Sequence, residues 1–479
     1  MATPIIQNAA AFSVEEITHI CSGTLEQGSP KQRVSGVSTD SRADGTGKLF
    51  VALSGESFDG HAFVAQAVAA GASAVLVERA VDVPANVAVI RVADALCALG
   101  DIARAHRRRW NGRVVAVAGS AGKTTTKATI AAALSALWPG QVHVTRGNLN
   151  NRVGVPMVLL AAKDTHRICI VEIGTNQLGE VAALSKIAEP DVAVLTLVAT
   201  EHSQGLGDLD AIEGEEASVF VGLKADGVIV VNQDDARALR SARATEAGRI
   251  VGYGASPPAA YQVLQRETLS AESSRVRVSR PSGGVIEATV PLLGAPAALA
   301  IAAAVAVADA VGAAPSPADT LAAGFASPLV AEAGRMRPVE LPDGTLLLDD
   351  SYNANPVSVL AALQTAQELS ARRNAELLLV LGEMRELGAF SEREHRQLGT
   401  AVASSGAAGL VAISGDARWF VQPALSAGMD AVFVADAAAA LPAVRQRLRA
   451  GSVVLIKASR GVRADKVVEG LRSGNGRAA

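Results

Sequence analysis

The chain has 479 residues, which is too long for one ordinary hydrophobic core and predicts two to four domains; we expect three. Hydrophobic residues make up 49% of the sequence, charged residues 19% and aromatic residues 3%, so we expect a globular protein with cores of Ala, Val and Leu. The formal net charge of -3 provides no overall field that would recruit nucleic acid or an anionic membrane, and we expect neither as a partner.

Local features of the sequence further limit the kind of protein that this chain can form. Cys21, Cys97 and Cys169 have no paired spacing, which argues against disulfides and thiolate metal sites and favours a reducing, cytoplasmic compartment. The N-terminus has no basic segment followed by an apolar one, so no export signal is expected. The alanine-rich run 295–308 is shorter than a bilayer span and is interpreted as a buried helix. The cluster Arg107-Arg108-Arg109 lacks interleaved aromatic residues and is interpreted as a solvated helix end.

The first part of the chain, residues 1–92, is predicted to form short strands at 33–38, 48–53 and 73–77 and a helix at 61–70. Between the first two strands, the loop Ser38-Thr-Asp-Ser-Arg42 combines hydroxyl groups, a carboxylate and a guanidinium. Such a loop can hold a polar ligand, although an Asx turn explains Asp40 equally well. After a predicted helix at 95–110, the chain reaches its most informative motif.

That motif is an apolar run from Val114 that breaks into Gly119-Ser-Ala-Gly-Lys-Thr-Thr-Thr126, the pattern of a buried strand leading into a phosphate-binding loop. Its two glycines allow a tight turn, and the helix that starts near Lys123 adds the positive end of its dipole. Lys123 is expected on the outer phosphates of a nucleotide and the Thr124 hydroxyl on Mg²⁺. Val117 stands where the common motif has its first glycine, and the alternative is a plain strand-to-helix turn with an exposed lysine.

Beyond this loop, continuous apolar runs at 168–172, 192–198 and 227–232 predict a parallel sheet that is covered on both faces. Ligands of such sheets gather at the carboxyl ends of the strands, where Glu172 and His202 lie. Both could converge on the magnesium of Thr124 or on a second ion, and each taken alone could equally be a loop or helix-flanking residue.

A polar turn follows the helix after the loop and contains Asn148, Asn150 and Asn151. These asparagines are expected to contact substrate or phosphate, or else to satisfy backbone groups.

From about 255 to 295 the pattern loosens into short strand-like segments, and a boundary near Ser327-Pro328 opens a third unit. In this unit strands at 346–349, 377–381, 410–413, 431–434 and 453–456 alternate with helices such as 357–369 and 392–402, which predicts a second sheet of βαβ type. Polar segments lie at the carboxyl ends of three of these strands, at residues 349–356, 382–388 and 457–461. We expect two polar rims to face one cleft; the alternatives are a strand-ending turn at Asp349 and Asp350 and a solvated helix start at Lys457 and Arg460.

Taken together, several motifs resemble the Mur ligase family over nearly the whole chain: Ser38 to Arg42 with Asp59-Gly-His61, Gly119 to Thr126, Gly147 to Asn151, Glu172-Ile-Gly-Thr-Asn176 and Asp349-Asp-Ser-Tyr-Asn-Ala-Asn-Pro356. The last motif is similar to that of the members that add D-alanyl-D-alanine to UDP-N-acetylmuramoyl-tripeptide. The resemblance implies an α/β fold of three domains in a monomer. These are a small N-terminal domain for the UDP substrate (1–92), a central parallel-sheet domain with the ATP-binding P-loop (93–327) and a C-terminal Rossmann-like domain (328–479).

The resemblance also implies roles for individual residues, with ATP and Mg²⁺ as cofactors. Catalytic groups would be Lys123, Glu172 and His202, and the metal would be held by Thr124, Glu172 and His202. We add Glu216 to both sets as a hypothesis of our own, explained below. The nucleotide would contact Gly119, Ser120, Ala121, Gly122, Lys123, Thr124, Thr125, Arg335 and Asp350. The substrates would contact Ser38, Asp40, Ser41, Arg42, Asn148, Asn150, Asn151, Tyr352, Asn353 and Asn355.

Two segments depart from the family pattern. A carbamylated lysine usually follows the metal histidine by about fourteen residues, but this chain has Glu216 there, and we hypothesise that its carboxylate reaches the metal directly. Glu213 and Glu215 lie close by, and the alternative is that all three glutamates occupy a solvated helix face. In the segment Gly294 to Ala300 the histidine and asparagine that lie beside adenine in relatives are missing.

The resemblance implies ATP-driven amide formation through an acyl phosphate. Alternatives are a sister ligase that adds a single amino acid, a folate-type glutamate ligase, and a non-catalytic nucleotide-binding scaffold.

Overall fold

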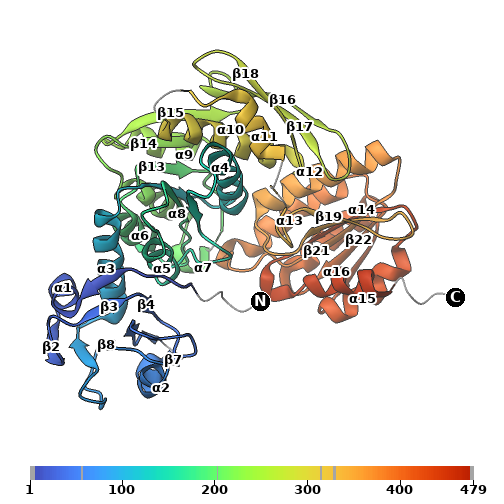
Figure 1. Cartoon of the computed structure of the whole chain (residues 1–479). Coiled ribbons are helices and arrows are strands. Elements are labelled where there is room, and N and C mark those ends of the chain that lie inside the picture. Colours follow the sequence, from blue (N-terminus) through green and yellow to red (C-terminus); the bar gives the residue numbers. More distant parts are fainter. Residues whose placement is uncertain are drawn as a thin grey trace.

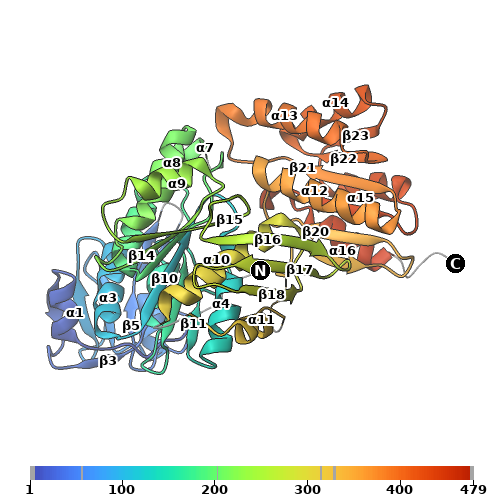
Figure 2. The ribbon, with the colours of Figure 1, turned by 90° about the horizontal axis from the view of Figure 1, so that it is seen from above.

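The computed structural model describes residues 6–55, 58–201, 203–312, 315–326, 329 and 331–474. Its strands form three α/β units in chain order, and the central unit lies between the other two in both views (Figure 1, Figure 2). The predicted α/β class is therefore confirmed. His202 and the predicted boundary at Ser327-Pro328 lie outside the described residues.

The N-terminal unit is built on a five-stranded sheet in the order β2-β9-β8-β5-β4, parallel except for the β2–β9 pair. Its elements are β1 (Ala11–Ser13), α1 (Val14–Ile20), β2 (Thr24–Gln27), β3 (Arg33–Ser35), β4 (Val37–Ser38), β5 (Leu49–Val51), β6 (Ser54–Gly55), β7 (Phe58–Asp59), η1 (Gly60–Phe63), α2 (Val64–Ala69), β8 (Ala74–Val77) and β9 (Ala88–Arg91). The helix predicted at 61–70 thus divides into a 3-10 turn and α2. Helix α3 (Ala95–Arg109) leads from this unit into the next.

The central unit is organised around a nine-stranded sheet in the order β11-β12-β10-β13-β14-β15-β16-β17-β18. Its elements are β10 (Arg113–Ala118), α4 (Lys123–Leu137), β11 (Val142–Val144), α5 (Gly154–Leu160), β12 (Ile168–Glu172), α6 (Glu180–Ala188), β13 (Val192–Leu195), α7 (Ser203–Leu206), α8 (Leu209–Ala217), η2 (Ser218–Phe220), β14 (Val228–Asn232), α9 (Ala236–Arg243), β15 (Arg249–Gly254), β16 (Tyr261–Thr268), β17 (Ser274–Ser279), β18 (Val285–Val290), α10 (Gly294–Val311) and α11 (Ala318–Ala326).

The strands from β11 to β16 pair in parallel, as predicted, but β16, β17 and β18 pair antiparallel. The predicted parallel sheet is therefore confirmed, and the strand-like segments of 255–295 add an antiparallel edge to it. The physical reason is the length of the connections: residues 269–273 and 280–284 are too few to cross over the sheet, and short connections join antiparallel neighbours.

Both faces of the central sheet are buried. Along β10, Val114, Ala116 and Ala118 belong to one hydrophobic core and Val115 and Val117 to another, because successive side chains point to opposite faces. Helices α3, α5 and α6 cover the first face, and α4, α10 and α11 cover the second. The continuous apolar runs were thus correctly interpreted as strands buried on both sides.

Helix α10 is the alanine-rich segment for which a buried helix was predicted, and that prediction is confirmed. Among the described residues, α10 is the one helix that is long enough and apolar enough to cross a membrane. However, 72% of this helix is buried inside the protein. Burial among α4, β16 and the central strands accounts for its composition.

The C-terminal unit has a six-stranded sheet in the order β19-β20-β24-β21-β22-β23, parallel except for β19. Its elements are β19 (Arg337–Glu340), β20 (Leu346–Asp350), α12 (Pro356–Arg373), β21 (Leu377–Gly382), η3 (Gly388–Phe390), α13 (Ser391–Ala403), β22 (Gly409–Ile413), η4 (Gly415–Phe420), α14 (Val421–Ser426), β23 (Asp430–Val434), α15 (Ala437–Arg447), β24 (Val453–Lys457), η5 (Arg460–Val462) and α16 (Asp465–Gly474).

Helix α12 ties this unit to the antiparallel edge of the central sheet, which reaches towards it (Figure 2). Arg266 on β16 lies 2.6 Å from the carboxylate of Glu368 on α12, and the Thr268 hydroxyl donates to the same carboxylate at 2.6 Å. One turn later, Arg372 donates to the carbonyl oxygen of Leu269 at 2.8 Å. These contacts join the C-terminal unit to the β16 edge of the central unit.

The interpretation of the arginine cluster as a solvated helix end is wrong for Arg107. Its side chain is only 3% exposed and donates to Ala188 O at 3.0 Å and to the Asp191 carboxylate at 2.7 Å. Arg108 pairs with Glu189, and Arg109 with Glu16 of the N-terminal unit. The side chains of Arg108 and Arg109 nevertheless stay 57% and 46% exposed, so the interpretation holds for these two arginines.

Candidate functional site

The loop after β10 has the geometry of a phosphate-binding loop. Gly119 has a φ of 125° and Gly122 a φ of 84°, values that favour glycine, and α4 begins at Lys123. A Cβ on Gly119 would lie 2.1 Å from Thr196 Oγ1, so a larger residue does not fit there. Val117 lies inside β10, where the chain needs no glycine, which explains why the missing first glycine of the motif does not disturb the turn.

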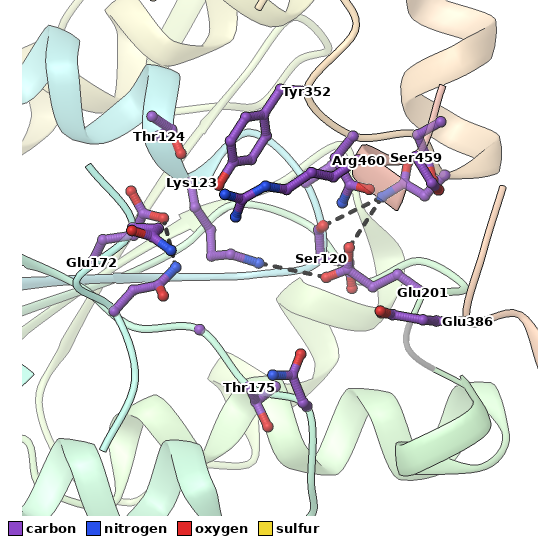
Figure 3. Close-up of a pocket in the computed structure, with 18 of the residues that line it drawn as sticks. Ser120, Lys123, Thr124, Glu172, Thr175, Glu201, Tyr352, Glu386, Ser459 and Arg460 are labelled. Carbon is purple, nitrogen blue, oxygen red and sulfur yellow. Dashed lines mark hydrogen bonds and ion pairs between the residues drawn. The ribbon is translucent and has the colours of Figure 1, made fainter. Parts of the chain in front are cut away.

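A cavity of about 780 Å³ opens above this loop (Figure 3). From the central unit it is lined by residues 120–124, Gly147, Asn148, Asn150, Asn151, Glu172, Gly174–Asn176, Glu180 and Glu201. From the C-terminal unit it is lined by Glu332, Ala333, Arg335, 352–355, 385–387 and 459–461. The predicted pair of polar rims facing one cleft is therefore present. Gly119, Thr125 and Asp350 are not among its lining residues.

Lys123 lies at the centre of the cavity. Its ammonium donates to Gly119 O and lies 3.4 Å from Glu201 Oε1 and 3.9 Å from Glu216 Oε1. Burial by itself would lower the pKa of Lys123, but the carboxylates of Glu201, Glu216 and Glu172 outweigh it, so the pKa is raised. The lysine is thus held as a cation where a polyphosphate would sit.

Glu172 is also charged although it is only 3% exposed. Its Oε2 lies 3.0 Å from Lys127 Nζ, and its Oε1 accepts from Asn150 Nδ2 at 3.0 Å. Burial would raise the pKa of Glu172, but Lys127 and Arg335 outweigh burial and lower it. Lys127 was not predicted, although its position one helical turn after Lys123 on α4 would have placed it on the same side of the helix.

The three glutamates of α8 have separate roles, and the interpretation as a solvated helix face is wrong, because all of them are buried. Glu213 pairs with Arg237 and Arg240 on α9. Glu215 accepts from the backbone N–H groups of Gly179 and Val181 at the start of α6, at 2.6 and 2.8 Å. Glu216 alone reaches the phosphate-binding loop, where its Oε2 accepts from Gly119 N at 2.7 Å.

The oxygen donors near Lys123 suit a hard cation. The Thr124 hydroxyl and the Glu172 carboxylate line the cavity, and Glu216 approaches the loop from behind. Within the described residues, which omit His202, there is no group of three His, Cys, Asp or Glu side chains that could hold a metal ion. Mg²⁺ usually takes one or two carboxylates together with phosphate oxygens and water, so this donor set fits it without a closed protein cage.

The predicted asparagines lie together beside Glu172. Asn150 binds its carboxylate, and Asn148 lines the cavity. Asn151 also lines the cavity, but its Oδ1 accepts from Val153 N and Gly154 N at 3.2 and 2.8 Å at the start of α5. Asn151 therefore does satisfy backbone groups, the alternative considered from the sequence.

The C-terminal rim is anchored by Asn355, the N-cap of α12. A capping box with Ser358 orients the Asn355 side chain. With Oδ1 occupied, Nδ2 donates to Ser120 O at 3.3 Å and to Glu201 Oε2 at 3.2 Å. A residue of the third unit thus binds the phosphate-binding loop directly.

The Tyr352 ring lies next to Asn355. The guanidinium groups of Arg335 and Arg460 lie 4.3 Å and 5.8 Å from the centroid of this ring, in cation–π geometry. Asn353 lines the same rim. Asp350 lies behind it, where its carboxylate accepts from Lys457 at 2.6 Å and from Met336 N at 3.0 Å. Lys457 is 3% exposed, so the alternative of a solvated helix start is wrong for it.

The loop Ser38 to Arg42 is not among the residues that line the central cavity. Ser38, Asp40 and Ser41 border a small hollow of their own in the N-terminal unit. Asp40 Oδ1 accepts from the backbone N–H of Arg42 at 2.9 Å, which is the Asx turn considered from the sequence. The Arg42 side chain, which pairs with Asp40, is 75% exposed.

The segment Gly294 to Ala300 forms the start of α10, and its small side chains serve packing. A Cβ on Gly294 would lie 2.4 Å from Thr365 Oγ1 on α12. Ala297, Ala298 and Ala300 are buried in the core.

Sequence reasoning missed Glu201, Arg385, Glu386 and Ser459, all of which line the cavity. Glu201 could have been found, since it follows β13 at the carboxyl edge of the sheet, next to His202. Arg385 and Glu386 belong to a segment singled out from the sequence, but no role was given to them.

Sequence comparison finds three matches that together span most of the chain. Residues 33–107 match the Mur ligase family, catalytic domain; residues 117–308 match the Mur ligase middle domain; and residues 334–460 match the Mur ligase, glutamate ligase domain. A relative from Bacillus subtilis (strain 168), the UDP-N-acetylmuramoyl-tripeptide--D-alanyl-D-alanine ligase, is 34% identical over 96% of this chain and 98% of its own.

Solved structures agree with these matches. A crystal structure of MurF from Acinetobacter baumannii superposes with a TM-score of 0.86 at 29% identity and covers 97% of this chain and 100% of its own. The MurF ligase from Thermotoga maritima in complex with ADP gives a TM-score of 0.78 at 26% identity and covers 91% of this chain and 97% of its own.

Proposed function

The chain belongs to the Mur ligase family, and from this premise we propose that it is an ATP-dependent ligase that joins D-alanyl-D-alanine to UDP-N-acetylmuramoyl-tripeptide in peptidoglycan precursor synthesis. The observation that supports this most directly is the single cavity shared by the phosphate-binding loop and the rim of the C-terminal unit. The Bacillus subtilis relative, which aligns with 96% of this chain, is named for the same two substrates.

The reaction has two steps. The terminal carboxylate of the tripeptide attacks the γ-phosphorus, an O–P bond forms, and the bond to ADP breaks. The dipeptide ammonium first loses one proton to solvent. The amine then attacks the acyl carbon, a C–N bond forms, and phosphate leaves with the electron pair of the broken C–O bond and the second proton.

Lys123 supplies the positive charge that lets a carboxylate approach a polyphosphate, since burial among three carboxylates keeps it protonated. Mg²⁺, when bound, neutralises phosphate charge, and Thr124, Glu172, His202 and Glu216 would hold it. The Asn355 contact with Ser120 brings the third unit over the loop, which excludes the water that would hydrolyse an acyl phosphate.

The remaining assignments belong to the same proposal. The nucleotide is contacted by Gly119, Ser120, Ala121, Gly122, Thr125 and Arg335, with Asp350 behind the rim. The UDP end is bound in the domain 1–92 by Ser38, Asp40, Ser41 and Arg42, and other substrate contacts come from Asn148, Asn150, Asn151, Tyr352, Asn353 and Asn355. The domains 93–327 and 328–479 close on one another, and the enzyme works as a cytoplasmic monomer.

The test offers purified protein ATP, Mg²⁺ and UDP-N-acetylmuramoyl-tripeptide with either D-alanyl-D-alanine or single free amino acids, and measures phosphate release. Release that depends on the dipeptide supports the proposal. Release with a free amino acid but not with the dipeptide would assign the chain to a sister ligase instead.

Glu216 and the segment Gly294 to Ala300 depart from the family pattern, and these departures favour one alternative function. It is that of a scaffold that binds nucleotide without catalysis. The same assay separates it, because a scaffold binds ATP but releases no phosphate in response to any acceptor. A Lys123→Met variant is the control for contaminating phosphatase activity.

A further inference from the structure

Glu201 is a buried carboxylate whose partners come from two units of the protein. It follows β13, lines the cavity and is 6% exposed. Its Oε1 faces the Lys123 ammonium at 3.4 Å, and its Oε2 accepts from Asn355 Nδ2 at 3.2 Å. Glu201 therefore already receives an ammonium group in this structure.

A bound nucleotide changes the electrostatics around Glu201. Lys123 is the lysine of the phosphate-binding loop, so its ammonium turns to the phosphates when they are present. Among the described residues, Glu201 then keeps only the neutral amide of Asn355 as a partner. A buried carboxylate without a cation is costly, so the loaded site needs a second positive charge at this position.

The position of Glu201 separates it from two of the donors expected for Mg²⁺, Thr124 and Glu172. Figure 3 shows Thr124 and Glu172 on one side of Lys123 and Glu201 on the other, at the end of the cavity where Ser459 and Glu386 also lie. The Arg460 side chain extends from that end over Lys123 towards the Tyr352 ring. The charge that replaces Lys123 is therefore expected to come from the C-terminal side of the cavity.

That end of the cavity carries charges of both signs. Arg460 and Arg385 line it from the C-terminal unit, and Glu201 lines it from the central unit. The Arg460 guanidinium lies 5.8 Å from the Tyr352 ring centroid, and the backbone N–H of Arg385 donates to Ser459 Oγ at 2.9 Å. A small zwitterion, with an ammonium at one end and a carboxylate at the other, complements this arrangement.

We propose that Glu201 binds the ammonium of the incoming amine substrate in the place that Lys123 vacates, and that Arg460 faces the carboxylate of the same molecule. This inference rests on the proposed function and identifies where its second substrate lies. Glu201 binds and orients the nitrogen beside the loop on which the acid is activated.

The test separates the two half-reactions. The first is followed without dipeptide, as scrambling of the β,γ-bridge oxygen of ATP that depends on UDP-N-acetylmuramoyl-tripeptide; the second is followed as the KM for D-alanyl-D-alanine. In Glu201→Gln we expect isotope scrambling within about twofold of wild type and a dipeptide KM raised about 10- to 100-fold, because a charged hydrogen bond becomes neutral. Glu201→Asp, which keeps the charge, should lie closer to wild type.

Glu340→Gln serves as the matched control, since Glu340 pairs with Arg373 and its side chain is 58% exposed. Circular dichroism and thermal melting confirm that each variant folds. An unchanged dipeptide KM in Glu201→Gln overturns the proposal, as does a loss of scrambling with a raised Mg²⁺ requirement, which would make Glu201 a metal ligand. If wild type releases no phosphate with the dipeptide, the proposed function itself fails.

Discussion

Glu216 is the residue whose role can be tested most sharply, because its sequence position and its structural contacts suggest different functions. It takes the place of the family's carbamylated lysine, yet its Oε2 accepts from Gly119 N at 2.7 Å and its Oε1 lies 3.9 Å from Lys123 Nζ. A hydrogen bond to a charged acceptor contributes about 1.5–3 kcal/mol. At 3.9 Å and an effective dielectric constant of about 20, the attraction to Lys123 is about 4 kcal/mol before desolvation is subtracted.

Glu216→Gln keeps a hydrogen-bond acceptor for the loop but removes the charge, whereas Glu216→Ala removes both. We expect Glu216→Ala to lower the free energy of unfolding by about 2–4 kcal/mol and Glu216→Gln by about half as much, measured by urea denaturation. If the carboxylate supports the metal, both variants lose turnover by about 100-fold or more, about 2.7 kcal/mol of barrier, and need more Mg²⁺.

Glu213→Gln is the matched control, since Glu213 is a buried, paired carboxylate on the same helix that faces Arg237 and Arg240. It should lower stability without changing the Mg²⁺ dependence. Wild-type turnover with unchanged Mg²⁺ dependence in Glu216→Gln would refute the metal role and leave Glu216 as a support of the loop.

Three further predictions concern ionisable side chains outside α8. Arg107→Met should lower the free energy of unfolding by about 2–4 kcal/mol, because it leaves the carbonyl oxygens of Ala188 and Glu189 without their donor and removes one of the two cations on Asp191, which keeps Lys224. Arg108→Met, at a side chain 57% exposed, should cost under about 1 kcal/mol; equal losses in urea denaturation would contradict the assigned burial. Burial and neighbouring cations lower the pKa of His143 from 6.5 to about 4, so only the unfolded chain takes up this proton between those values. The contribution of His143 to stability is therefore full above pH 6.5 and falls by about 3 kcal/mol towards pH 4. His143→Gln should make the loss of stability over this range smaller by that amount when unfolding is followed against pH, and an unchanged slope would contradict the lowered pKa. Lys127→Met should lower the melting temperature of the ligand-free protein, because it removes the cation 3.0 Å from Glu172; an unchanged melting temperature would count against that ion pair.

Much of the local structure could be predicted because it depends on neighbours in the chain. The run before Gly119 forms β10, the glycines adopt positive φ, and α4 starts at Lys123, as the motif predicts. The alanine-rich run forms a buried helix since its composition offers nothing that water would stabilise.

The environment of the charged residues was predicted less well. Three glutamates within four positions of α8 face three different partners, and Lys457 is buried against Asp350 after being considered for a solvated helix start. Composition and spacing carry no information about which distant element covers a charged side chain.

The amino-acid sequence alone determines the helices and strands, the central strands that are buried on both faces and the phosphate-binding loop. These features are predictable because backbone preferences and side-chain periodicity act over a few residues. Only the tertiary structure decides that Glu201, Lys123 and Asn355 meet in one cavity and that Arg107 of α3 is buried against the end of α6. The reason is physical: a charge becomes part of a site when segments far apart in the chain remove it from water and supply its partners, and that depends on how the units pack.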